Sequence, residues 1–180
     1  MLKANFITAQ EAAEKIQDGS TLCTIGMTLV SASESILKAI EKRFETVGHP
    51  ADITLVHSCG QSDRKDGIQH LAHEGLVKRI VGSHWGLQPR WMEMIANSQV
   101  EAYCLPQGQI AQLYRSMACG LPGKMSKVGL GTFIDPRVEG GKMNDRTKPL
   151  PDIVDILEYG GEEYMFYKEI PLDTVLIRGT

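Results

Sequence analysis

The alternation of short apolar runs with helical patterns limits the fold of this sequence more than any other feature. Four runs have the composition of buried strands, and each leads into a glycine-containing turn: STLCTIG, DITLVHSCG, LVKRIVGSHWG and VEAYCLPQG. The segments between them repeat apolar residues at helical spacing, as in Ile36, Leu37, Ile40 and Phe44. Apolar strands joined by helices are typical of a parallel sheet that is covered on both faces. We therefore predict an α/β fold built on an open, mostly parallel sheet with helices on both faces.

Local signals mark several boundaries of these elements. Thr8 with Glu11 forms a capping box for a first helix, and Pro89 suits the first turn of a later one. Ser31 or Ser33 can cap the helix that follows the first strand.

The sequence changes character after Gly123. The stretch VGLGTFIDPRVEGGKMNDRTKPLPD is too long for an ordinary connection, so we predict an active-site loop there. IVDILEYGGEEYMFYKEI indicates a β-hairpin that turns at Gly160 and Gly161, and DTVLIRGT indicates a buried strand. We expect residues 1–180 to form one domain, and the final strand pattern indicates an incomplete one.

Composition excludes several classes of protein. The 180 residues are 42% hydrophobic and 23% charged, as in ordinary globular proteins. A net charge of -3 offers no surface for nucleic acid or an anionic membrane, and no apolar run approaches the ~20 residues of a membrane helix. The N-terminal residues lack the apolar segment of a signal peptide, and the four cysteines form no CxxC pair. We expect a cytoplasmic protein with free thiols and no nucleic-acid or membrane partner.

Glycines mark the place where a ligand is expected. Open parallel sheets bind ligands outside the carboxyl ends of their strands, and Gly26, Gly60, Gly86 and Gly108 fall at those ends. No GxGxxG or GxxxxGK[ST] fingerprint is present. The GLG ending at Gly131 is only a GxG, so a pair of loop glycines is favoured over a phosphate cradle.

Gln107 lies between a proline and a glycine, where a predicted strand turns into a helix. It is the strongest candidate for a side chain that takes part in chemistry. A glutamine amide donates a hydrogen bond without changing protonation state, which suits a developing oxyanion. Gly108 would let backbone N–H groups approach a ligand. The alternative is that Gln107 caps its own helix, and the residues alone favour neither interpretation.

Other titratable side chains have structural alternatives. His70 and His73 share a helical face without a third ligand nearby, which favours a solvated surface over a metal site. His57 either polarises a ligand or bonds to the backbone, as does His84. Cys59 lacks a suitably placed base and is better explained as an inert thiol.

Acids near the glycine turns are few. Glu34 and Glu74 are the isolated acids closest to them in the sequence. For Glu34 we favour a place in the first turn of its helix, where the helix dipole stabilises a carboxylate.

Several motifs in order resemble one enzyme family. LPQG…QLYRSMACGLPG is followed by VGLGTFIDPRVEGGKMN and YGGEEYMFYKEIPLDTVLIRGT. This order is similar to the N-terminal half of family I CoA-transferases, closest to the propionate/acetate CoA-transferases and more distantly to the α half of 3-oxoacid CoA-transferases. The likeness covers nearly the whole chain.

The resemblance implies exchange of CoA between a short-chain acyl-CoA and a free carboxylic acid. In the family a glutamate carboxylate attacks the thioester, giving an acyl-glutamyl anhydride and then a glutamyl-CoA thioester. The family's PQG glutamine lines the acyl pocket and matches Gln107, and its first glycine-rich turn matches Gly26 and its neighbours. CoA is then a substrate and covalent intermediate, no permanently bound cofactor or metal is expected, and the enzyme is expected to be a homo-oligomer.

Two departures from the family pattern matter. The first turn reads GMTLVS, with Met27 and Thr28 where the family has glycines, so Met27 and the loop around Phe133 become candidate specificity contacts. No serine-glutamate-asparagine-glycine motif is present, so the nucleophilic glutamate is expected outside this chain, in a C-terminal or β half. The alternative is a non-catalytic domain that binds an acyl-CoA or a small carboxylate. A phosphosugar isomerase is less favoured because no paired acid and base is evident.

Overall fold

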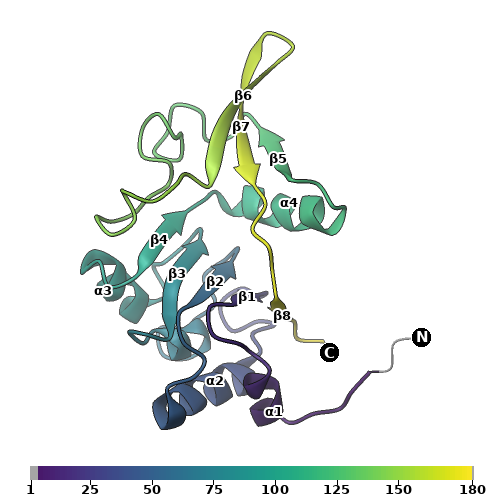
Figure 1. Cartoon of the computed structure of the whole chain (residues 1–180), viewed down its shortest axis with the longest axis vertical. Helices are drawn as coiled ribbons and strands as arrows, with labels where there is room; N and C mark the ends of the chain where they lie inside the picture. Colours follow the sequence, from purple (N-terminus) through teal and green to yellow (C-terminus); the bar gives the residue numbers. More distant parts are fainter. Residues whose placement is uncertain (1–3, 180) are drawn as a thin grey trace.

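A five-stranded sheet forms the centre of the protein. The computed structural model describes residues 4–179. All five strands of this sheet are parallel, in the order β4-β3-β2-β1-β8 (Figure 1). They are β1 (Thr21–Thr24), β2 (Ile53–His57), β3 (Val77–Gly82), β4 (Glu101–Cys104) and β8 (Thr174–Leu176). Their carboxyl ends therefore lie along one edge of the sheet, as predicted.

Side chains alternate between the two faces of this sheet. One face packs against α1 (Ala9–Glu14), α2 (Glu34–Val47), η1 (Gly67–Leu71) and α3 (Pro89–Ala96). Leu22, Leu55 and Ile80 point to this face, where Leu37 and Trp91 are buried with them. Because strand side chains have a period of two, the intervening residues are available to a second core.

The other face is covered by a helix and a small sheet. Cys23, Val56, Val81 and Tyr103 point to α4 (Gln107–Ala118). Next to α4 lies an antiparallel sheet in the order β5-β7-β6, which stands at the top of Figure 1. Its strands are β5 (Gly123–Ser126), β6 (Val154–Tyr159) and β7 (Glu162–Lys168). The predicted α/β sheet with a C-terminal hairpin is confirmed.

Most of the local signals are confirmed. Thr8 caps α1 with Glu11 in a capping box, and Pro89 lies in the first turn of α3. Gly160 and Gly161 form the hairpin turn, both with positive φ (63° and 78°), a conformation that favours glycine. Ser33 stands at the N-cap of α2 but its side chain makes no capping hydrogen bond, so that prediction is only half right.

The glycine- and proline-rich segment 127–153 has a structural role that the sequence did not predict. The Met143 amide donates to Ala102 O at 2.9 Å, and the Cys104 amide donates to Gly141 O at 2.7 Å. Buried Asn144 donates from Nδ2 to Ile95 O and Val100 O, which both precede β4 in the chain. The segment thus covers the outer edge of β4, where unpaired backbone groups would otherwise be exposed.

The prediction of a buried strand at the end of the chain is wrong in one respect. β8 pairs with β1 and is an edge strand in the described part of the chain. Val175 is 43% exposed and Ile177 is 70% exposed. The helices described in residues 4–179 are all too short or too polar to cross a lipid bilayer.

Candidate functional site

The turns after β1, β2 and β3 are joined to one another by hydrogen bonds. The Thr28 amide donates to Gly60 O at 2.8 Å, which joins the first turn to the second. The Ser83 hydroxyl donates to Ser58 O at 2.5 Å, which joins the third turn to the second. The predicted ligand-facing edge is therefore one connected surface of backbone.

Two buried glutamines hold these turns, and the sequence reasoning missed both. Gln61 donates from Nε2 to Thr24 O at 2.7 Å, at the end of β1. With its amide oriented to satisfy both neighbours, Gln88 donates to His84 O at 2.8 Å and accepts from the Gln61 amide at 3.0 Å. Both glutamines are fully buried. Their signal in the sequence is weak: each is a polar residue beside a glycine turn, and nothing in the sequence indicates that its side chain is buried.

Close contacts explain two of the predicted glycines. A Cβ at Gly26 would lie 2.8 Å from Val30 O, and a Cβ at Gly60 would lie 2.9 Å from His84 Cδ2 and from the side-chain amide of Gln88. A side chain at either position would force a neighbouring group to move.

The other predicted glycines differ in their surroundings. A Cβ at Gly86 would lie 3.0 Å from His84 Cε1, whereas one at Gly108 would meet nothing within 4 Å. Gly131 lies in the 127–153 segment rather than among the sheet-edge turns, and its amide donates to Asp135 at 2.8 Å. The contact with Asp135 occupies a donor that a phosphate would need.

The first turn keeps a glycine-like backbone despite its larger residues. Thr28 and Ser31 both have positive φ, 52° and 62°. The Thr28 hydroxyl donates to Met27 O at 2.6 Å, and Met27 pairs with Val30 across the turn. The Met27 side chain points outward and is 58% exposed.

Gln107 is the exposed first residue of α4. Pro106 takes the N-cap position and no side chain caps this helix, so the helix-cap alternative for Gln107 is wrong. Within residues 4–179 its side-chain amide has no hydrogen-bond partner. The start of α4 also carries the positive end of the helix dipole. Gln107 thus offers a free donor at the carboxyl end of β4.

Of the two roles predicted for His57, the structure shows the hydrogen bond to the backbone. Its Nδ1 contacts Cys59 O at 2.7 Å, which makes Nδ1 the donor, and its ring packs edge-on against Trp85. Complete burial lowers the pKa of His57 to about 4, despite the hydrogen bond to the carbonyl. The contact involves the backbone of Cys59, so no imidazole–thiol pair is formed. His84, in contrast, is exposed at the third turn.

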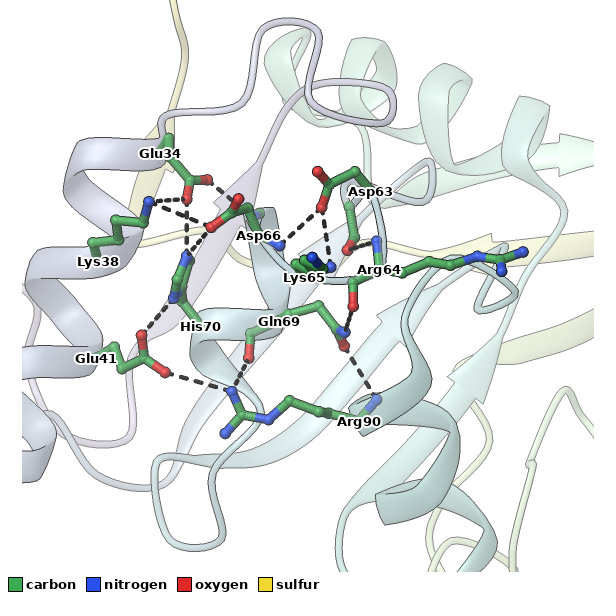
Figure 2. Close-up of polar contacts among 12 residues, drawn as sticks. Glu34, Lys38, Glu41, Asp63, Arg64, Lys65, Asp66, Gln69, His70 and Arg90 are labelled. Atoms are coloured by element: carbon green, nitrogen blue, oxygen red, sulfur yellow. Dashed lines mark hydrogen bonds and ion pairs between the residues drawn. The ribbon is translucent and has the colours of Figure 1, made fainter.

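His70 and His73 lie in a network of charged side chains rather than on a solvated surface, so that prediction is wrong. Figure 2 shows the part of the network around His70. His70 Nε2 lies 2.8 Å from Glu34 Oε1, and its Nδ1 contacts Glu41. Glu41 also contacts His73 Nε2 at 2.8 Å. The His70 side chain is only 13% exposed. The sequence signal was present but weak: Glu34 and Glu41, seven residues apart, lie on one face of α2.

The charges of this network neutralise one another. Lys38 Nζ lies 3.1 Å from Glu34 and 3.3 Å from Asp66, and Arg90 lies 3.5 Å from Glu41. The Lys38 ammonium thus takes the position between two carboxylates that a cation would need. Glu34 is in the first turn of α2, as predicted. Glu74 precedes β3 and so lies toward the amino ends of the strands, away from the glycine turns.

An apolar groove of about 610 Å³ lies between α4 and the exposed edge of the sheet. Its walls include Cys23 and Ile25 of the first strand region, Tyr114 and Met117 of α4, and Ile177 beyond β8. The groove is mainly apolar and carries no charged group other than Glu169.

Comparison with known proteins decides the family. A family model described as coenzyme A transferase matches residues 6–180. The chain belongs to the coenzyme A transferase family. The caffeate CoA-transferase of Acetobacterium woodii is 43% identical over 178 residues, which are 98% of this chain and 34% of that protein.

Two further relatives extend the match. Acetate CoA-transferase YdiF of Escherichia coli O157:H7 is 37% identical over 176 residues, 97% of this chain and 33% of that protein. A crystal structure of YdiF as a thioester complex with CoA matches with a TM-score of 0.92 at 36% identity, covering 97% of this chain and 34% of that chain. One subunit of a probable succinyl-CoA:3-ketoacid coenzyme A transferase of Bacillus subtilis is 28% identical over 141 residues, 78% of this chain and 56% of that protein.

The family resemblance predicted from the sequence is therefore confirmed. The chain spans about a third of the length of the caffeate and acetate CoA-transferases that it matches.

Proposed function

We propose that this chain is the N-terminal portion of an acyl-CoA:carboxylate CoA-transferase, which moves CoA between a short-chain acyl-CoA and a free acid. One observation carries the proposal: in a chain of this family, the free amide of Gln107 stands at the ligand-facing edge of the sheet. The YdiF structure with the same fold was solved as a CoA thioester complex, which supports the same assignment.

The nucleophile belongs to another part of the enzyme. The loops that follow β1, β2, β3 and β4 at the carboxyl edge, residues 25–33, 58–66, 83–88 and 105–106, contain no glutamate. We propose that a glutamate outside this chain attacks the thioester carbonyl, forming an acyl-glutamyl anhydride and releasing the CoA thiolate. The thiolate then attacks the glutamyl carbonyl, which expels the first acid and leaves a glutamyl-CoA thioester. A second acid reverses both steps.

This chain supplies donors and walls for that chemistry. The Gln107 amide N–H donates to the oxyanion that develops on the thioester carbonyl, and it does so without a proton transfer. Gly26, Gly60, Gly86 and Gly108 bring backbone close to the substrate. Gly131, whose amide is bonded to Asp135, is proposed to border the substrate only through the loop that carries it. Met27 and Phe133 border the acyl group.

The partner of this chain is the C-terminal or β half of the enzyme, on the same or a separate polypeptide. The Bacillus subtilis relative, whose name makes it one subunit of a divided transferase, supports this part of the proposal. We further propose that the enzyme is a cytoplasmic homo-oligomer. It uses CoA only as a substrate.

The test is CoA exchange between acetyl-CoA and propionate. The chain is assayed alone and as a chimera in which it replaces the matching third of YdiF. We expect exchange by the chimera only. Exchange by the chain alone would contradict a nucleophile outside it. A folded but silent chimera that still binds acetyl-CoA would favour the non-catalytic binding domain.

A further inference from the structure

The contacts of His70 require its ring to be positively charged. Each ring nitrogen faces a carboxylate oxygen, Nε2 that of Glu34 at 2.8 Å and Nδ1 that of Glu41. A carboxylate only accepts hydrogen bonds, so both nitrogens must donate. An imidazole donates from both nitrogens only as the imidazolium.

Charged groups face this ring from every element around it. α2 contributes Glu34, Lys38 and Glu41, and Asp66 approaches Nε2 at 3.3 Å from the residue before η1. Arg90 of α3 and His73 after η1 meet the far oxygen of Glu41. With His70 protonated, the negative charges of Glu34, Glu41 and Asp66 are matched by the positive charges of Lys38, His70 and Arg90. Loss of the His70 proton leaves one carboxylate without a matching positive charge.

A chain of hydrogen bonds connects this network to the glycine turns. Glu34 Oε2 accepts from the Gly67 amide at 2.9 Å. The next amide, that of Ile68, donates to Gln61 O at 2.9 Å. Gln61 holds the end of β1, and its neighbour Gly60 accepts from the Thr28 amide.

We propose that His70 is a positioning residue: as an imidazolium between Glu34 and Glu41 it fixes the segment from Gly60 to Leu71 on α2, and so makes the placement of the glycine turns depend on pH. The carboxylate that binds the ring also binds the Gly67 amide, so loss of the ring proton changes both contacts. The proposal rests on the fold and does not depend on CoA transfer.

The direction of the pH dependence follows from the ring's surroundings. Burial works to lower the pKa of His70, but the hydrogen bonds and charges of Glu41 and Glu34 outweigh it and hold the pKa above its ordinary value. A raised pKa means that the stabilisation is complete below the ordinary value near ~6.5 and is lost as the pH rises through the raised pKa. The segment is therefore held under mildly acidic conditions and released under alkaline ones.

The experiment is an NMR titration of the 180-residue chain between about pH 5 and pH 10. The His70 ring Cε1–H signal and the backbone amide signals of Gly67 and Thr28 are followed together. We expect a ring midpoint above ~6.5 and the same midpoint for both amides. Glu41→Gln removes one carboxylate charge and should lower the ring and amide midpoints together by about one pH unit.

His49→Gln is the matched control, because His49 pairs with Asp18 in a half-exposed contact that shares no side chain with this network. It should leave all three midpoints unchanged. A ring midpoint at or below the ordinary value, or amides of Gly67 and Thr28 that do not follow the ring, would overturn the proposal. The unmodified chain alone can give that result, so the test stands even if a variant does not fold.

Discussion

The glycine turns and the His70 network lie close together but satisfy their polar groups differently. At the turns, Gln107 leaves its amide free and exposed at the start of α4. In the network, His70 and Glu41 are mostly buried, and their charged groups contact partners within the protein. Free donors at a ligand-facing edge are available for chemistry, whereas mutually neutralised charges hold elements in place. The comparison predicts that substitutions in the first region change activity and those in the second change stability.

The largest effect should come from Gln107→Ala in the YdiF chimera. We expect kcat to fall roughly 10²-fold, because the developing oxyanion loses a donor, with the free energy of unfolding unchanged. Steady-state kinetics and urea unfolding measure both quantities. Gln112→Ala, on the exposed side of the same helix, is the control and should retain activity. A loss below tenfold for Gln107→Ala would remove it from the oxyanion contact.

Glu41→Ala should lower stability, in contrast to Gln107→Ala, which should lower kcat. It leaves His70 and His73 without a shared acceptor, so we expect the free energy of unfolding to fall by about 2 kcal/mol. Chemical denaturation of the chain measures this loss. Glu93→Ala removes an exposed acid from α3 and should cost far less. Equal losses in the two variants would mean that the network adds no stability.

A smaller effect is expected from pH. Stability should decline as the pH rises above neutrality, because His70 has a raised pKa and loses its proton. At the acidic end, Glu41 gives the opposite slope: burial works to raise its pKa, but His73 and His70 hold the pKa below its ordinary value, so its contribution is lost as the pH falls. Thermal unfolding from pH 5 to pH 9 should show the alkaline decline, and His70→Gln should flatten it. A decline that persists in His70→Gln would assign it to other groups.

The smallest effect is expected at Met27. Its side chain is mostly exposed on the first turn, so Met27→Gly should change the relative kcat/KM of acetyl-CoA and longer acyl-CoA substrates by only about three- to tenfold. Val47→Ala, exposed at the other end of α2, controls for loss of surface apolar area. An unchanged substrate profile would place Met27 outside the acyl pocket.

Features encoded within a few residues could be predicted from the sequence. The apolar periods give the sheet and its helices, and the turn at Gly160 and Gly161 needs only its own backbone conformation. The His70 network leaves only a weak signal in the sequence, because its contacts join residues 29 and 36 positions apart. The exposure of β8 could not be predicted, because an apolar run indicates a buried strand but does not reveal whether that strand has neighbours on both sides.

The candidate site was predicted in outline only. The positions of Gly26 and Gly60 followed from the strand ends, but the buried amides that support them did not, since Gln61 and Gln88 are recognised only by the contacts they make across the fold.

The most direct test of the central claim, that this chain frames the acyl group while the nucleophile lies elsewhere, is the location of the covalent intermediate. The chimera is built with a protease site after residue 180, incubated with acetyl-CoA, cleaved under mildly acidic conditions and analysed by intact mass spectrometry. We predict a CoA thioester, formed with release of acetate, on the YdiF-derived fragment and none on residues 1–180. An adduct on residues 1–180 would contradict the claim.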